Sequence, residues 1–346
     1  MTDHLWPDVL GQLIRREDLP AELAEAALGA VLTGEATDAQ IAAFGVALRQ
    51  KGETPAELAA LVRAMLAHAE RVEVDGPLTD TCGTGGDRAG TVNVSTMAAL
   101  IAAGAGASIA KHGNRAQSSQ CGSADVLEAL GVVIDLGPDG VTRCIREAGI
   151  GFCFAQRYHS ALRHAAAARR ELGVPTTFNF LGPLASPAGA TRRTVGVSDP
   201  AMAPRLIEAL AELGVERALV FYGHDGLDEL TTTTTSTVYE LRGGAIGRFD
   251  VDPTALGLPT VARGALAGGD AGGNAQAVHG VLAGRTGPIR DIAILNAAAA
   301  LVVADLAEDL AAGLEVARRS IDDGQAAAAL EALVRTSVAA REAEAA

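Results

Sequence analysis

The sequence has few aromatic residues, few cysteines and no apolar run long enough to cross a bilayer. Phe, Trp and Tyr make up 3% of the 346 residues, so we expect a core of Ala, Val, Leu and Ile. The four cysteines form neither a C-x-x-C pair nor a Cys/His cluster at zinc spacing, which is typical of buried thiols in a reducing cytosol. The first residues lack the basic and apolar regions of a secretory signal. These absences predict a cytoplasmic protein without a membrane partner.

Basic residues are also scarce. The chain has 28 Lys and Arg against 42 Asp and Glu, which gives a formal net charge of −14. A general nucleic-acid binder needs a basic face that displaces counterions. The composition therefore argues against nucleic acid as a partner. A small anionic ligand is still compatible with this charge, because local backbone donors and side chains decide its binding.

The distribution of helix and strand signals predicts two domains. Residues 1–70 carry only helical patterns, with a capping box at Thr54-Pro55-Ala56-Glu57 and a similar device at Thr37 and Gln40. Further along the chain, we expect strands at 107–110, 132–136, 151–155 and 218–222 and helices at 123–130, 138–148, 160–172, 201–213, 291–305 and 310–334. This alternation indicates a mainly parallel sheet covered on both faces. We predict an α/β protein with a small all-helical domain at 1–74 and a large α/β catalytic domain at 75–346.

Two glycine-rich segments have the composition of a phosphate site. Residues 83–87 read Gly-Thr-Gly-Gly-Asp, and 91–96 supply hydroxyls and an amide where a helix should begin. Glycine lets the backbone approach a ligand closely, and a helix N-terminus favours anions. Lys111-His112-Gly113-Asn114-Arg115 adds two cations after a second apolar run. Together these segments predict a phosphorylated small-molecule substrate.

Two further features suit such a substrate. Asp228 and Glu229 follow a predicted strand, and Mg²⁺ prefers one or two carboxylates together with water and substrate phosphates. Arg169 lies near the end of a predicted helix, from which a guanidinium could bind a carboxylate with two parallel hydrogen bonds.

These segments together resemble the anthranilate phosphoribosyltransferase family nearly end to end, and Lys111–Arg115 is the most specific match. The resemblance implies the nucleoside-phosphorylase-like fold, in which residues near 176–190 rejoin the helical domain, and a homodimer formed through that domain. It also implies an enzyme of tryptophan biosynthesis. Such an enzyme transfers phosphoribose from 5-phosphoribosyl 1-pyrophosphate to the amine of anthranilate.

The resemblance carries specific roles onto this sequence by position. The residues expected at the phosphoribosyl pyrophosphate are Gly83, Thr84, Gly85, Gly86, Asp87, Thr91, Asn93, Val94, Ser95, Thr96, Lys111, His112, Gly113, Asn114, Arg115, Ala116, Gln117, Ser118, Ser119 and Ser123. Ser95, Asp228 and Glu229 would hold two Mg²⁺ ions. Gly83, Asn114, His159 and Arg169 would bind anthranilate. Arg169, Asn114 and Lys111 would act in catalysis.

The segment that lines the acceptor route departs from the family pattern. The family has Phe-Ala-Pro-x-x-His-Pro, whereas residues 154–160 read Phe-Ala-Gln-Arg-Tyr-His-Ser, and Leu162 and Tyr222 also differ from common family residues. Our hypothesis is that anthranilate remains the acceptor but binds differently and more weakly. Three alternatives stay open: a paralogue that uses another aromatic amine or carboxylate, a pyrimidine-nucleoside phosphorylase, and a non-catalytic nucleic-acid-binding relative.

Overall fold

The structure is a computed structural model that describes residues 4–116 and 120–346. Its N-terminal part is a bundle of four helices, α1 (Leu5–Ile14), α2 (Ala21–Leu32), α3 (Asp38–Lys51) and α4 (Pro55–Ala67). Both capping boxes predicted from the sequence are present, because the hydroxyls of Thr37 and Thr54 accept hydrogen bonds from the third backbone N–H of α3 and α4. The prediction that this region is helical is confirmed for its described residues.

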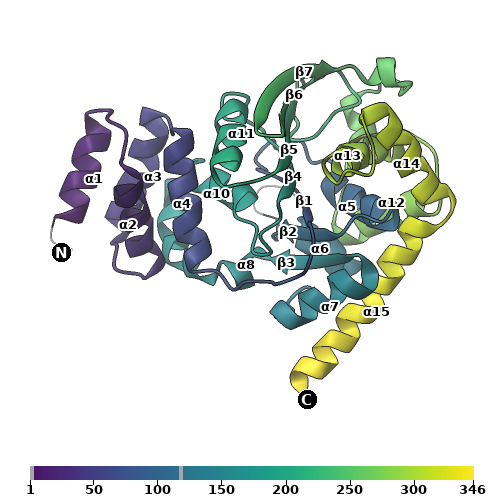
Figure 1. Cartoon of the computed structure of the whole chain (residues 1–346), viewed down its shortest axis with the longest axis horizontal. Coiled ribbons are helices and arrows are strands. Elements are labelled where there is room, and N and C mark those ends of the chain that lie inside the picture. The colour runs from purple at the N-terminus through teal and green to yellow at the C-terminus, as the bar shows by residue number, and fades with distance from the viewer. Residues whose placement is uncertain (1–3, 117–119) are drawn as a thin grey trace.

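A seven-stranded sheet forms the middle of the molecule (Figure 1). Its strands are β1 (Thr79–Gly83), β2 (Ile109–Gly113), β3 (Ile150–Phe154), β4 (Arg192–Gly196), β5 (Arg217–Gly223), β6 (Ser236–Arg242) and β7 (Ala245–Val251). The order across the sheet is β3-β2-β1-β4-β5-β6-β7. The first five strands are parallel and the last two are antiparallel. This confirms the predicted mainly parallel sheet.

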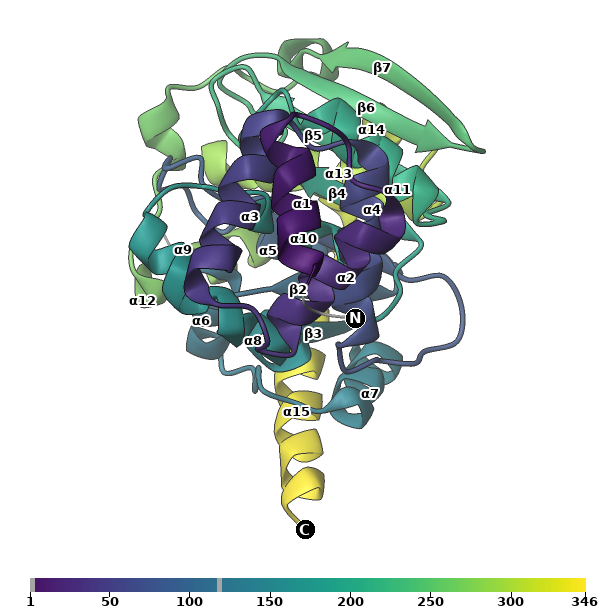
Figure 2. The ribbon, with the colours of Figure 1, turned by 90° about the vertical axis from the view of Figure 1, so that its left-hand side faces the viewer.

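Helices cover both faces of this sheet. The helices that follow the bundle in the chain are α5 (Val94–Gly104), α6 (Ser123–Ala129), α7 (Pro138–Ala148), α8 (Ala155–Tyr158), α9 (Ala166–Leu172), α10 (Phe178–Leu184), α11 (Ala203–Glu212), α12 (Ala271–Leu282), α13 (Pro288–Val303), α14 (Leu310–Asp322) and α15 (Gln325–Ala345). Short 3-10 helices lie at Ser160–Ala165, Pro253–Leu256 and Arg263–Leu266. Helices α5, α13 and α14 lie on one side of the sheet, and α10 and α11 lie between the sheet and the bundle (Figures 1 and 2).

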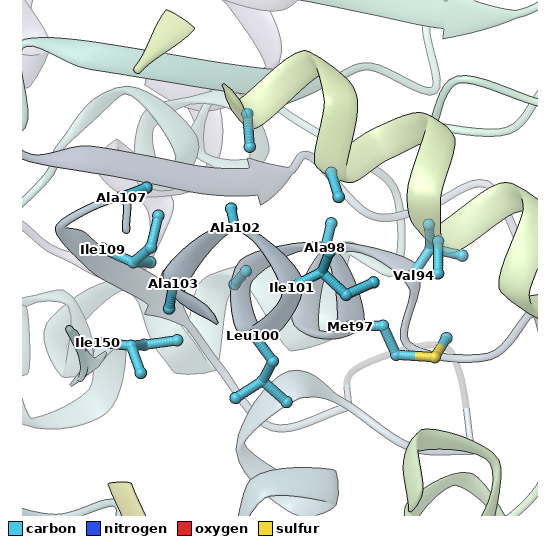
Figure 3. Packing of buried hydrophobic residues seen from close by; sticks show 14 of the residues in the cluster. Val94, Met97, Ala98, Leu100, Ile101, Ala102, Ala103, Ala107, Ile109 and Ile150 are labelled. Carbon is cyan, nitrogen blue, oxygen red and sulfur yellow. The ribbon is translucent and has the colours of Figure 1, made fainter. Parts of the chain in front are cut away.

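Two hydrophobic clusters correspond to these two sides. The larger one is centred on α5 and α13, and Figure 3 shows α5 side chains gathered with Ile109 and Ile150, the first residues of β2 and β3. The other joins the helical bundle to α10, α11 and the β4 and β5 side chains Val195 and Val220. Small alanine side chains on α5 and α13 allow these helices to pack closely, as the low aromatic content predicts.

Three predicted elements differ from the structure. Residues 132–136 are not a strand, because the run lies against α15, where the Val133 N–H donates to Ser337 Oγ at 3.0 Å instead of to a neighbouring strand. The helix predicted at 160–172 is a 3-10 helix followed by α9. The helix predicted at 310–334 breaks into α14 and α15 at Gly324, whose φ of 75° ends a right-handed helix.

Candidate active site

The sheet topology brings the glycine-rich segment to a crevice. The chain runs from β1 outward to β2 and β3, then returns to the other side of β1 as β4. Ligands of parallel sheets bind at the carboxyl ends of the strands where the order reverses in this way. Gly83 at the end of β1 pairs with Gly196 at the end of β4, so the loops that follow both strands lie side by side.

The loop after β5 lies directly over the ends of β1 and β4. The Asp228 carboxylate accepts a hydrogen bond from the Gly85 N–H at 2.7 Å. A Cβ on Gly83 would lie 2.4 Å from Asp228 Oδ2, and a Cβ on Gly196 would lie 1.6 Å from the Asp228 carbonyl oxygen. Only glycine at these two positions permits this approach. Gly85 and Gly86 have positive φ, which gives the loop its tight path.

Asp228, Glu229 and Asp87 form a crowded acidic group. Burial and the Asp87 charge raise the pKa of Asp228 to about 7. Burial and the Asp228 charge raise the pKa of Glu229 well above its usual range, while Lys111 opposes this increase and the Ser95 N–H hydrogen-bonds the carboxylate. The predicted metal residues Ser95, Asp228 and Glu229 therefore lie together. Carboxylates that repel one another in this way fit a divalent cation.

In the described part of the chain, no group of three or more His, Cys, Asp or Glu residues is placed to hold a metal ion by itself. Mg²⁺ usually keeps several water ligands and binds proteins through only one or two carboxylates together with substrate phosphates. The arrangement at Asp228 and Glu229 matches that mode of binding.

Lys111 lies beneath the glycine-rich loop and is 1% exposed. Its ammonium donates to the Thr81 carbonyl at 2.7 Å and to Ser95 Oγ at 3.3 Å. Burial lowers the pKa of Lys111, while the neighbouring Asp80 favours its charged form. The lysine connects β2 to β1 and to the start of α5, so it supports the loop from below.

The start of α5 offers polar groups to the same crevice. The side chain of the N-cap residue Asn93 makes no capping hydrogen bond, and Thr96 Oγ1 is buried without a hydrogen-bond partner among the described residues. Asn93 is held in place by hydrogen bonds to the Cys121 carbonyl and to Asn274. Thr91 pairs with Ala267 in an isolated bridge. The N-terminus of α5 favours anionic groups, of which the Glu229 carboxylate at the Ser95 N–H is one.

The segment after β2 is shaped by close contacts. A Cβ on Gly113 would lie 2.1 Å from Ser123 Oγ, which itself donates to the Asn114 carbonyl at 3.3 Å. Arg115 is already engaged by the carboxylates of Asp125 and Glu128 at 2.9 and 2.8 Å. Ala116 precedes the predicted residues Gln117, Ser118 and Ser119, which lie outside the described residues.

His112 and His159 are buried against each other, with their ring centroids 5.0 Å apart. Burial lowers the pKa of both imidazoles to about 3, so both are neutral at pH 7. His159 Nε2 lies 3.0 Å from the Ala185 carbonyl oxygen. The pair therefore provides a neutral, rigid wall below the ends of β2 and β3.

Arg169 is partly buried on α9 and lies over the Phe178 ring of α10, 5.8 Å from its centroid. Burial lowers the pKa of its guanidinium. Within residues 4–116 and 120–346, no carboxylate pairs with this group and no hydrogen bond engages it. Its N–H donors are therefore available for an anionic ligand.

Sequence reasoning missed the buried ion pair that supports the site. Asp80 of β1 accepts a hydrogen bond from the His112 N–H at 2.9 Å and lies 3.2 Å from the Arg193 guanidinium of β4. Arg193 also donates to the carbonyls of Pro183 and Leu184 in α10. In the sequence, Asp80 and Arg193 are charged residues within two separate, short strand-like runs. A charge in such a run is also typical of a solvated turn, so the sequence did not indicate that the two residues pair.

The comparisons agree with this architecture. A glycosyl transferase family helical bundle domain matches residues 7–69, and a glycosyl transferase family a/b domain matches residues 75–327. In the part of the chain that the structure covers, none of the helices could cross a membrane.

Relatives match over almost the whole chain. The anthranilate phosphoribosyltransferase of Roseiflexus castenholzii is 54% identical over 95% of this chain and 98% of its own. The structure of the Thermus thermophilus anthranilate phosphoribosyltransferase is 41% identical, with a TM-score of 0.91 over 95% of this chain and 99% of that one. The Saccharomyces cerevisiae enzyme in complex with PRPP and Mg is 26% identical, with a TM-score of 0.90 over 98% and 99%. The chain thus belongs to the anthranilate phosphoribosyltransferase family of glycosyl transferases.

Proposed function

We propose that this chain transfers phosphoribose from 5-phosphoribosyl 1-pyrophosphate to the amine of anthranilate, in tryptophan biosynthesis. The products are N-(5-phosphoribosyl)anthranilate and pyrophosphate. The observation that carries this proposal is the acidic pair Asp228 and Glu229, which lies over a glycine-rich loop at the switch point of the sheet. Family membership supports the same reaction, and so does the yeast relative in complex with PRPP and Mg.

The donor would bind with its phosphates against the glycine-rich loop and the start of α5. We propose that Ser95, Asp228 and Glu229 hold two Mg²⁺ ions there. When bound, these ions would neutralise the charge that develops on the leaving pyrophosphate. Lys111 places a buried positive charge close to Glu229, which favours the ionised form of that carboxylate.

The acceptor would bind through its carboxylate and ring. Arg169 has unengaged N–H donors, and a guanidinium binds a carboxylate bidentately. Asn114 and Gly83 lie at the ends of neighbouring strands, where they can close the site around the ring. His159 is 4% exposed, so its contribution is the shape and neutrality of the wall.

The reaction needs orientation more than acid–base catalysis. The C1–O bond to pyrophosphate breaks, the C1–N bond to the aryl amine forms, and the amine then loses a proton to solvent. An aryl amine is already neutral and nucleophilic at pH 7, which fits a site whose histidines are both neutral. Arg169 and Asn114 would hold the amine in line with C1, and the buried Lys111 would stabilise the departing charge.

We also propose the organisation that accompanies this function. The helical domain would span 1–74 and be rejoined by about 176–190, which is supported by the packing of Phe178 and Leu181 with the bundle. The homodimer would form through this domain, where Ile14 is 76% exposed. We propose the cytoplasm as its compartment, where cysteine thiols stay reduced.

The acceptor is tested by a substrate panel, because the segment around Gln156 departs from the family. Gln156 is exposed on the short helix α8, and Tyr158 is buried and donates to the Leu136 carbonyl at 3.1 Å. The panel contains anthranilate, other aromatic amines and aromatic carboxylates with the donor and Mg²⁺, and thymidine with phosphate. Preferred turnover of anthranilate supports the proposal. Turnover of another acceptor, or phosphorolysis of thymidine, would assign the chain to one of the alternatives.

The panel is repeated with Gln156→Pro. Tighter binding of anthranilate by this variant is expected if the missing proline weakens the acceptor site. Ordinary anthranilate affinity in the native chain, unchanged by the substitution, would refute that part of the hypothesis.

A further inference from the structure

The end of β4 and the turn that follows it make four contacts with the glycine-rich loop. The Ser198 hydroxyl donates to the Gly85 carbonyl at 2.7 Å and lies 3.4 Å from Thr84 Oγ1. The Ser198 N–H donates to the same Thr84 oxygen at 3.1 Å. The Thr84 N–H donates to the Gly196 carbonyl at 2.9 Å. Ser198 is therefore the side chain from outside the loop that holds the loop carbonyl in place.

The next residue in the same turn connects it to the helical bundle. The Asp199 carboxylate pairs with the guanidinium of Arg49 near the end of α3. Arg49 is itself held by Glu53 at 3.2 Å, and it lies 5.0 Å from the centroid of the Phe180 ring. Asp199 also accepts the Ala201 N–H at 3.1 Å, which fixes the turn before α11. A continuous set of contacts thus runs from α3 to the glycine-rich loop.

We propose that Ser198 is a positioning residue for the donor, and that the ion pair between Asp199 and Arg49 sets its place. Gly85 is exposed and has positive φ, so contacts with other residues fix where its carbonyl points, and within the loop the Thr84 hydroxyl donates to this carbonyl at 3.2 Å. Its N–H is used by Asp228, and its carbonyl is used by Ser198. The two bonds together hold the peptides that face the phosphates. The inference rests on the proposed function, because it takes this loop as the donor site.

The test is a set of steady-state measurements with Ser198→Ala. The substitution removes the hydroxyl and leaves the backbone N–H bond to Thr84 intact. Loss of one or two hydrogen bonds should raise the KM for the donor about fivefold to thirtyfold. The KM for anthranilate should stay at the native value, and the melting temperature should fall by no more than about 3 °C. Ser198→Thr keeps the hydroxyl and should restore the donor KM.

Ser108→Ala is the matched control. Ser108 is an exposed serine just before β2, at the opposite edge of the sheet, and the same substitution there should change neither KM. An unchanged donor KM in Ser198→Ala would overturn the proposal. So would equal rises in both KM values together with a lower melting temperature, since those describe a general loss of structure.

The link to the bundle is tested by a double-mutant cycle. Asp199→Asn removes the charge pair with Arg49 but keeps an acceptor for the Ala201 N–H. The donor KM of Asp199→Asn should rise severalfold. The donor KM of the double variant with Ser198→Ala should be no higher than that of Ser198→Ala alone. Additive effects would show that Asp199 does not act through Ser198.

Calorimetric titration with 5-phosphoribosyl 1-pyrophosphate and Mg²⁺ separates this inference from the proposed function. Weaker donor binding by Ser198→Ala supports the positioning role even if the native chain fails to use anthranilate. Equal donor affinity in both proteins, or absence of donor binding by the native chain, would overturn it.

Discussion

Asp228→Asn should stabilise the ligand-free protein, although it removes a residue that the proposed reaction needs. Burial and the Asp87 charge raise the pKa of Asp228 to about 7 from an ordinary 3.8. An acid whose pKa is raised on folding contributes stability only while it is protonated. That contribution is complete at low pH and is lost as the pH rises from about 4 to about 7. At pH 8 the native carboxylate is ionised beside Asp87 and Glu229, whereas an asparagine stays neutral.

The size of the effect follows from the same pKa. A pKa of about 7 in place of 3.8 makes the ionised side chain about 4 kcal/mol less stable in the folded chain. Asp228 keeps part of its surface in contact with water, which screens the repulsion, so we expect about 2 kcal/mol. For a chain of 346 residues this corresponds to a rise of about 3 °C in Tm. At pH 5 the gain in stability of Asp228→Asn over the native chain should be less than half of its value at pH 8.

The assay is thermal unfolding of the native chain and Asp228→Asn in EDTA, between pH 4.5 and pH 8.5. The asparagine oxygen can still accept the Gly85 N–H, so the loop should keep its place. Asp75→Asn is the control, because Asp75 is fully exposed and distant from the crevice. A variant that is less stable than the native chain at pH 8, or an advantage that does not change with pH, would refute the reasoning.

Three further predictions follow from the site. In a steady-state assay, Arg169→Ala should raise the KM for anthranilate roughly 30-fold to 100-fold with little change in the donor KM. Substitution of the exposed neighbour, Arg170→Ala, should change neither KM in the same assay. Gly196→Ala should abolish activity or soluble expression, because its Cβ would lie 1.6 Å from the Asp228 carbonyl oxygen, whereas Gly264→Ala has open space and should express and turn over normally. EDTA should stop product formation and added Mg²⁺ should restore it; turnover that persists in EDTA would contradict the metal assignment.

The parts of the site that are local in sequence were predictable. The glycine-rich loop, the segment after β2 and the acidic pair after β5 each carry their chemistry within a few residues, so their composition indicates phosphate and metal binding. The sheet then brings them together because parallel strands end at a common edge. The capping boxes at Thr37 and Thr54 were predictable for the same reason.

The parts that depend on distant contacts were not predictable. Residues 132–136 have the pattern of a strand, but Ser337 on α15 supplies the partner that a neighbouring strand would have supplied. β4 was missed because it begins with two arginines, whose partners come from distant segments: Asp80 pairs with Arg193, and Asp305 pairs with Arg192. Ser198 lies two residues after the end of β4, so missing the strand concealed the residue that contacts the glycine-rich loop.

The most direct measurement of the central claim is the fluorescence of anthranilate after 5-phosphoribosyl 1-pyrophosphate and Mg²⁺ are added to the purified chain. We predict a decrease that requires the protein, the donor and the metal together, and that is lost in the double variant Asp228→Asn with Glu229→Gln. A constant signal from folded protein that binds the donor would contradict anthranilate as the acceptor. Full activity in the double variant would contradict the assignment of Asp228 and Glu229 to the metal.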